Sequence, residues 1–151
     1  MTSGGAPAVQ TMLDDSGLTL TLPNDMGALA AGATALREFL QQRGLAERPL
    51  YDAELVFEEM VTNTIRHGYP GPGGHAIEVR VGLSDDQCLL TFDDDAQAFD
   101  PTAAAAPVLP DSIEDAKIGG LGIMLVKKVA STMQYQRLNG RNTLRVSIPR
   151  A

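Results

Sequence analysis

Residues 54–71 read ELVFEEMVTNTIRHGYPG, and this stretch predicts a long helix that ends in a turn. Apolar residues recur in it at helical spacing, yet Glu59 and Asn63 lie one helical turn apart on the same face. A carboxylate and an amide oxygen placed in this way can accept a proton and ligate a hard cation such as Mg²⁺. Taken alone, the pair is more typical of a solvated helix face.

The chain around this helix predicts a single domain without affinity for polyanions. It has 151 residues and is 44% hydrophobic, which is enough apolar surface for one core. Its formal net charge of -7 would repel a phosphate backbone or an anionic membrane surface, so we expect neither nucleic acid nor membrane as a partner. An acidic surface is typical of a protein that meets other proteins.

The start of the chain and its single cysteine indicate a cytoplasmic protein. Cys88 lies in an apolar run, where we expect a small buried thiol, and one cysteine cannot form an intramolecular disulfide. The first residues lack the basic and apolar segments of an export signal. We expect residues 1–16 to form a flexible tail and residues 17–151 to form the folded domain.

Hydrophobic periodicity predicts an α+β fold. Strands are expected over residues 17–23, 76–83, 87–92, 134–138 and 143–148, and helices from Asn24 or Asp25 to about residue 43, over residues 49–67 and over residues 121–133. Helices packed on one face of a mostly antiparallel sheet, as a two-layer sandwich, bury these apolar faces most simply. The irregular residues 93–120 form a long connection, which predicts a functional loop such as a lid.

Acidic residues follow the third predicted strand in FDDDAQAFDP, residues 92–101. Asp94 at the end of a buried strand can accept a hydrogen bond from an exocyclic amine such as that of adenine. A hydrophilic loop is the alternative interpretation of this segment by itself.

Glycines lead into the last predicted helix in IGGLGIMLVKK, residues 118–128. Without side chains, Gly119, Gly120 and Gly122 allow backbone N–H groups to approach an anion, and the helix dipole favours a phosphate there. The segment is not a P-loop, because the lysine followed by serine or threonine of that motif is missing.

The order and spacing of these three segments resemble the ATP-binding domains of the gyrase, chaperone, histidine-kinase and MutL superfamily, which have the Bergerat fold. The chain is most similar to the anti-sigma-factor serine-protein kinases of that superfamily. The matching positions are Glu59, Asn63, His67, Gly68 and Tyr69 in the first motif, Asp94, Phe99, Asp100 and Pro101 in the second, GGLGIMLV in the third, and Thr143 at the start of the last strand.

The resemblance implies a role for each matching residue. Glu59 would be the general base, Asn63 would hold Mg²⁺, and Asp94 would pair with the adenine amino group. The remaining positions implied to line ATP or ADP are Ala96, Ala98, Gly119, Gly120, Leu121, Gly122 and Thr143, the last beside Asp94. Residues 102–118 would close over the phosphates.

Ala96 and Ala98 depart from the superfamily pattern, which has glycine at both positions. If either position required a positive φ, alanine would cost on the order of 1 kcal/mol or more. This departure leaves two hypotheses open. The resemblance implies a kinase that phosphorylates a small anti-sigma-antagonist (STAS-like) protein, regulates transcription by partner switching with a sigma factor, and pairs as a homodimer. The alternative is a non-catalytic interaction module of the same fold, with or without nucleotide.

Overall fold

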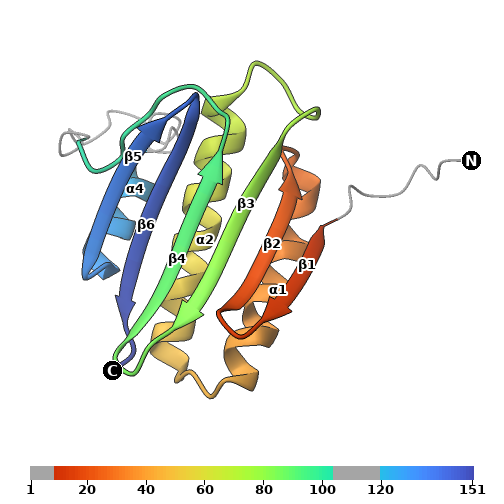
Figure 1. Ribbon diagram of the computed structural model, residues 1–151. Coiled ribbons are helices and arrows are strands. Elements are labelled where there is room, and N and C mark those ends of the chain that lie inside the picture. Colours follow the sequence, from red (N-terminus) through yellow and green to blue (C-terminus); the bar gives the residue numbers. More distant parts are fainter. Residues whose placement is uncertain (1–8, 104–119) are drawn as a thin grey trace, which may run out of the picture.

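The computed structural model describes residues 9–103 and 120–151, and in them a six-stranded antiparallel sheet carries helices on one face (Figure 1). The elements in chain order are β1 (Gln10–Asp14), β2 (Gly17–Pro23), the 3-10 turn η1 (Met26–Ala28), α1 (Leu29–Gln42), α2 (Glu47–Gly68), β3 (Ala76–Leu83), β4 (Gln87–Asp94), α4 (Gly120–Val129), β5 (Thr132–Leu138) and β6 (Arg141–Pro149). This two-layer arrangement confirms the predicted α+β class.

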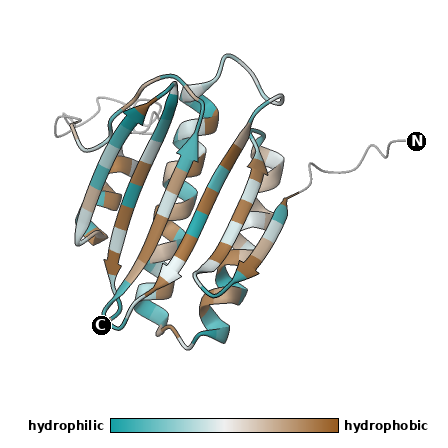
Figure 2. Cartoon of the chain, viewed as in Figure 1, coloured by the Kyte–Doolittle hydropathy of each residue, from teal (hydrophilic) through white to brown (hydrophobic). Residues whose placement is uncertain are grey.

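Buried and more exposed side chains alternate along the central strands, so that one face of the sheet forms the core with the helices (Figure 2). The apolar residues of these strands that face the helices are Leu18, Leu20, Leu22, Ile77, Val79, Val81, Leu90, Leu144, Val146 and Ile148. They pack against buried residues of α1 and α2, including Leu36, Leu40, Val56 and Phe57. Cys88 is also fully buried, as the sequence predicts.

Close approach of α1 to its neighbours depends on Gly32. A Cβ atom at this position would lie 2.8 Å from a methyl group of Leu22 and 2.8 Å from the ring of Phe57. The glycine therefore allows α1 to pack tightly against both β2 and α2.

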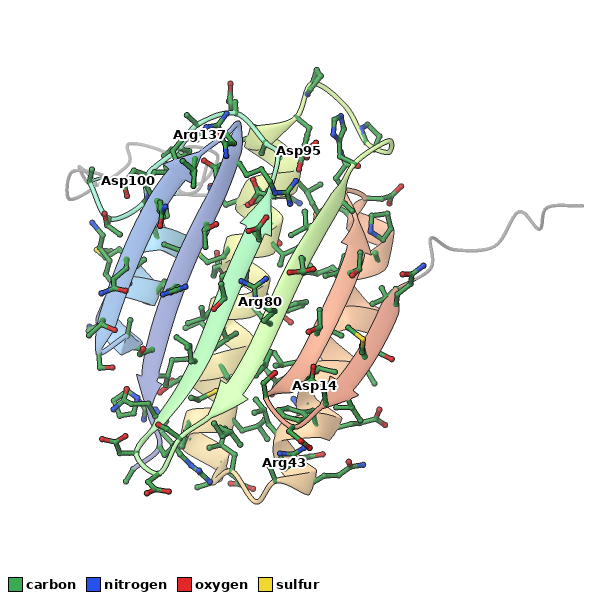
Figure 3. All side chains as sticks on the ribbon, in the orientation of Figure 1. Asp14, Arg43, Arg80, Asp95, Asp100 and Arg137 are labelled. Carbon is green, nitrogen blue, oxygen red and sulfur yellow. The ribbon has the colours of Figure 1, made fainter. Side chains whose placement is uncertain are left out.

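The strand order β1-β2-β3-β4-β6-β5 brings the last strand beside β4. In this register Asp94 lies opposite Asn142, and Asp93 lies opposite Thr143. Residues from the middle and the end of the chain therefore meet at one end of the sheet, where Figure 3 labels Asp95 and Arg137.

The prediction of a flexible tail over residues 1–16 is wrong for residues 10–14, which form β1. All five residues of β1 are exposed, so backbone pairing with β2 rather than burial holds them in place. The turn that joins the two strands is stabilised by hydrogen bonds from Ser16 to the Asp14 carboxylate and by Gly17, whose φ is 135°. A Cβ atom on Gly17 would overlap the carbonyl oxygen of Val81. Composition alone did not reveal this hairpin.

Asp25, one of the two predicted caps, accepts a hydrogen bond from the backbone N–H of Gly27 at 2.8 Å and begins η1. Asn24 instead bonds to the backbone of Gly71 and His75, after α2. Residues 104–118 of the predicted lid lie outside the described residues, and so does Gly119. In the parts of the chain that are described, no helix combines the length and the apolar character needed to cross a membrane.

Candidate functional site

A cavity of about 370 Å³ lies at the end of the sheet where β4 stops. Its walls come from α2, the segment after β4, α4 and the β5–β6 hairpin. The apolar part of the lining includes Met60, Phe92, Ile123 and Leu144, and the polar part includes Asn63, Asp94 and Asn142. Apolar walls with a few convergent polar groups are typical of a small-molecule site.

Helix α2 supplies the first predicted pair. Asn63 lines the cavity, while Glu59 lies one turn earlier on the same face and is half-buried. A Cβ atom on Gly122 would overlap Oε2 of Glu59 and lie 3.0 Å from its Cδ. Gly122 thus lets the first turns of α4 approach the Glu59 carboxylate directly, so the first and third sequence motifs meet in the fold.

Asp94 is the buried acid of the cavity, with 4% of its surface exposed. Its Oδ1 accepts hydrogen bonds from the backbone N–H of Ala96 at 3.0 Å and from Nδ2 of Asn142 at 2.9 Å. Burial raises the pKa of Asp94, while these two hydrogen bonds act in the opposite direction. The result is a desolvated carboxylate with a fixed orientation.

Asn142 is the functional candidate that the sequence interpretation missed. Its Nδ2 donates to Asp94, to the carbonyl of Ala96 at 3.2 Å and to the carbonyl of Gln97 at 3.1 Å. Its Oδ1 accepts from the hydroxyl of Tyr135 and from Nη1 of Arg137 at 3.0 Å. The alternation in NTLRVSI could have identified it, because Asn142 shares the inward face of Leu144, Val146 and Ile148.

Thr143 lies on the other face of the sheet. Its hydroxyl donates to Oδ2 of Asp93 at 3.1 Å, and Thr143 is not part of the cavity lining. The structure therefore does not bring Thr143 to Asp94, because successive residues of a strand point to opposite faces. Asn142, one residue earlier, has the position that the resemblance suggested for Thr143.

Ala96 and Ala98 both line the cavity, and neither has a positive φ, since Asn139 is the non-glycine residue with that conformation in the described chain. The strain considered for these alanines is thus absent. Ala96 instead packs against the end of α2, where a Cβ atom on Gly68 would lie 2.6 Å from its own Cβ. The backbone of Gln97 also donates to the Gly68 carbonyl at 3.0 Å.

Hydrogen bonds to two polar side chains, Asn24 and Asp95, hold the loop after α2 in place beside the cavity. Asn24 is fully buried, donates to the Gly71 carbonyl at 3.2 Å and accepts from the backbone N–H of His75 at 3.1 Å. Asp95 accepts from the Tyr69 hydroxyl at 2.8 Å and contacts Nδ1 of His75 at 2.8 Å, and the two rings are stacked 4.7 Å apart. The hydrogen bonds from His75 and then from Tyr69 lower the pKa of Asp95.

The structure thus gathers much of the predicted site. Asn63, Asp94, Ala96 and Ala98 line one cavity, and Glu59 and Gly122 touch beside it. Gly120 and Leu121 begin α4, while Gly119 falls outside the described residues.

An antiparallel sheet with helices on one face and a cavity beside α2 and α4 is consistent with a histidine kinase-like ATPase domain. The model of that family matches residues 22–148, and the chain belongs to the family.

Relatives of the chain are named as kinases. It is 29% identical over 126 residues to the serine/threonine-protein kinase BtrW of Bordetella bronchiseptica, a match that covers 80% of this chain and 87% of BtrW. It is 25% identical over 114 residues to the serine-protein kinase RsbW of Listeria innocua, with 73% of each chain covered.

Solved structures share the fold. The crystal structure of the SiaB–SiaC complex from Pseudomonas aeruginosa matches with a TM-score of 0.57 and 20% identity, over 87% of this chain and 88% of that chain. The crystal structure of the RsbU and RsbW domains of a Mycobacterium tuberculosis protein also gives a TM-score of 0.57, at 16% identity, over 86% of this chain and 32% of that one.

Proposed function

We propose that this chain is an ATP-dependent serine-protein kinase whose substrate is a small protein of the anti-sigma-antagonist (STAS-like) type. The observation that carries the proposal is one cavity lined by both Asn63 and Asp94, with Glu59 one turn away on α2. The names of BtrW and RsbW, both serine kinases, support the same activity.

The cavity suits the adenine base. Met60, Phe92 and Leu144 give apolar walls for a planar ring, and Asp94 is a buried acceptor for an exocyclic amino group. Both hydrogen bonds described for its carboxylate use Oδ1, so neither of them uses Oδ2. We assign Oδ2 to the amino group of the base.

The phosphates would lie toward α4. Backbone N–H groups in its first turn, at Gly120 and Gly122, would face them, and the positive end of the helix dipole would favour them. Asn63 would ligate Mg²⁺ through its amide oxygen, and the ion, when bound, offsets phosphate charge. Within residues 9–103 and 120–151 no cluster of three or more His, Cys, Asp or Glu side chains could hold a metal without the nucleotide.

Glu59 is the proposed general base. Its carboxylate would take the proton from the serine hydroxyl of the partner as the serine oxygen attacks the γ-phosphorus. The bond between the γ-phosphorus and the bridging oxygen of ADP breaks in the same reaction, which leaves phosphoserine and ADP. Contact with Gly122 would hold the Glu59 side chain at the boundary between α2 and α4.

Regulation would follow from partner exchange in the cytoplasm. The unphosphorylated STAS-like protein and a sigma factor would compete for the kinase, and the bound nucleotide would favour the complex that it stabilises more. We also propose that two copies pair as a homodimer, in keeping with the resemblance on which the partners were assigned.

Calorimetric titration with ATP and ADP, with and without Mg²⁺, tests the site directly. We expect micromolar, Mg²⁺-dependent binding that is weakened about tenfold or more in Asn63→Ala, since a charge-assisted contact is lost. Absence of binding at millimolar nucleotide would refute the proposal. Transfer of labelled phosphate to STAS-like proteins by the parent and by Glu59→Gln then tests the base, and equal rates would exclude Glu59 from that role.

One observation favours a nucleotide-independent interaction module as the second candidate. Oδ1 of Asp94, the amide of Asn142 and the Ala96 carbonyl already bond to one another, and no fully buried side-chain nitrogen or oxygen in the described residues lacks a partner. Such a cavity is stable without a ligand. The calorimetric titration separates the two candidates, because the nucleotide-independent module would bind neither ATP nor ADP.

A further inference from the structure

The amide of Asn142 connects the three segments that enclose the buried end of the cavity. It contacts Asp94 at the end of β4, the backbone of the following segment at Ala96 and Gln97, and two side chains of β5. Asn142 itself is 7% exposed and lines the cavity. Such a fully bonded amide in the lining of a site can decide which ligand groups its neighbours accept.

We propose that Asn142 is a positioning residue for purine selectivity: it keeps Asp94 as a hydrogen-bond acceptor, so that the cavity takes a 6-amino purine and rejects a 6-oxo purine. This inference rests on the proposed function, because it requires a purine nucleotide in the cavity. It assigns to Asn142 a role in choosing the base, whereas Asp94 makes the contact with it.

The orientation of the amide follows from its surroundings. Arg137 carries only donors, and its Nη1 lies 3.0 Å from Oδ1 of Asn142. The Tyr135 hydroxyl donates to the same oxygen. A flipped amide would place its NH₂ group against the guanidinium and its oxygen against the carbonyls of Ala96 and Gln97. Arg137 is itself fixed by a 2.7 Å hydrogen bond to the Ala96 carbonyl. The NH₂ group therefore has to face Asp94.

The NH₂ group changes what Asp94 can bind. A carboxylate accepts hydrogen bonds only, whereas a protonated carboxyl group can also donate to a purine carbonyl. Burial and the nearby charge of Asp93 favour protonation, while the bonds from Asn142 and Ala96 and the charge of Arg141 oppose it. Loss of the Asn142 donor therefore shifts Asp94 toward the form that tolerates a 6-oxo group.

ATP and ITP are the matched probes, because they differ at position 6 of the base and in the proton at N1. Calorimetry gives the ratio of their dissociation constants for the parent, Asn142→Ala, Tyr135→Phe and Gln136→Ala. We expect the parent to prefer ATP, and Asn142→Ala to reduce that preference about tenfold, as for an unpaired buried polar group. Tyr135→Phe keeps the ring in the lining and should reduce the preference by a smaller factor.

Gln136→Ala is the control. It removes an exposed amide from the same hairpin, on the face that carries Thr143, and should leave the ratio unchanged. The inference would be wrong if Asn142→Ala lost ATP and ITP affinity equally. It would also be wrong if the ratio of the two dissociation constants stayed unchanged in both Asn142→Ala and Tyr135→Phe. Either result would leave the proposed function standing. If Asn142→Ala does not fold, the ratio in Tyr135→Phe decides. A parent that binds neither nucleotide would overturn the proposed function, and this inference with it.

Discussion

The Glu59 carboxylate fills the space in which a side chain on Gly122 would begin. Oε2 would overlap a Cβ atom on Gly122, and the carboxylate carbon would be 3.0 Å from it. The two residues belong to α2 and α4, helices that are separated in the sequence by two strands and a long connection. Because one residue is the proposed base and the other lies in the proposed phosphate-binding turn, their contact links two roles that would otherwise be independent.

Gly122→Ala should therefore impair phosphoryl transfer more than nucleotide binding. The added methyl group must move either Glu59 or α4, and a misplacement of about 1 Å can cost about a hundredfold in rate. Transfer rates and ATP affinities measured side by side would test this expectation. Gly71→Ala is a suitable control, because Gly71 has no positive φ and no atom lies within 4 Å of its added Cβ. If Gly122→Ala and Gly71→Ala changed the transfer rate equally, this prediction would be contradicted.

Gly68→Ala should destabilise the fold by about 1–3 kcal/mol, the usual cost of overpacking. Its Cβ atom would lie 2.6 Å from that of Ala96. Removing the opposing methyl group in Gly68→Ala/Ala96→Gly should recover most of the loss. Denaturant unfolding of the two single variants and the double variant measures this coupling, and additive effects would show that the two positions do not interact.

Asp94→Asn should weaken nucleotide binding without loss of stability. Because burial raises the pKa of Asp94, its ionised form destabilises the native state at neutral pH, and a neutral side chain removes that cost. We expect an unchanged or higher Tm together with at least a roughly tenfold loss of ATP affinity. Asp93→Asn is the matched control, because Asp93 pairs with Arg141 and Thr143 on the open face of the sheet. A large drop in Tm for Asp94→Asn alone would contradict this prediction.

His75→Ala should move acid unfolding to higher pH. Hydrogen bonds from His75 and Tyr69 lower the pKa of Asp95 below its ordinary value of 3.8. The ionised Asp95 therefore contributes stability that is present above that value and is lost as the pH falls through the lower native pKa. Circular dichroism as a function of pH measures the midpoint. His67→Ala, a change at the other histidine of the chain, should leave the midpoint in place.

Cys88 should resist alkylation in the folded protein. Burial raises the pKa of its thiol to about 11, so the reactive thiolate is scarce at pH 8. Mass spectrometry after treatment with iodoacetamide should find the native protein unmodified and the protein in guanidinium chloride fully modified at this single cysteine. Rapid modification under native conditions would mean that β4 opens readily.

The sequence allowed prediction of the elements whose apolar period was unambiguous. The hairpin of β3 and β4, the long α2 helix and the helical position of Glu59 and Asn63 needed no tertiary information. Strand β1 was missed because none of its side chains is buried, so hydrophobic alternation left no signal. The role expected for Thr143 came from the resemblance to the family. In the structure, the pleat of β6 directs Asn142 toward the cavity and Thr143 to the opposite face of the sheet. The packing of Ala96 against the end of α2 depends on the missing side chain of Gly68, a residue 28 positions earlier that no local sequence pattern relates to it.

The place of β6 between β4 and β5 has a consequence for synthesis of the protein. Asp94 and Asn142 are 48 positions apart, so a growing chain that has completed α2 and β4 still lacks the amide that fixes Asp94. The edge of β4 is also unpaired until β6 arrives. The buried end of the cavity is therefore assembled last, and a nascent or truncated chain without β6 lacks this part of the proposed nucleotide site. Nucleotide binding would then require that β6 has been synthesised and has paired with β4.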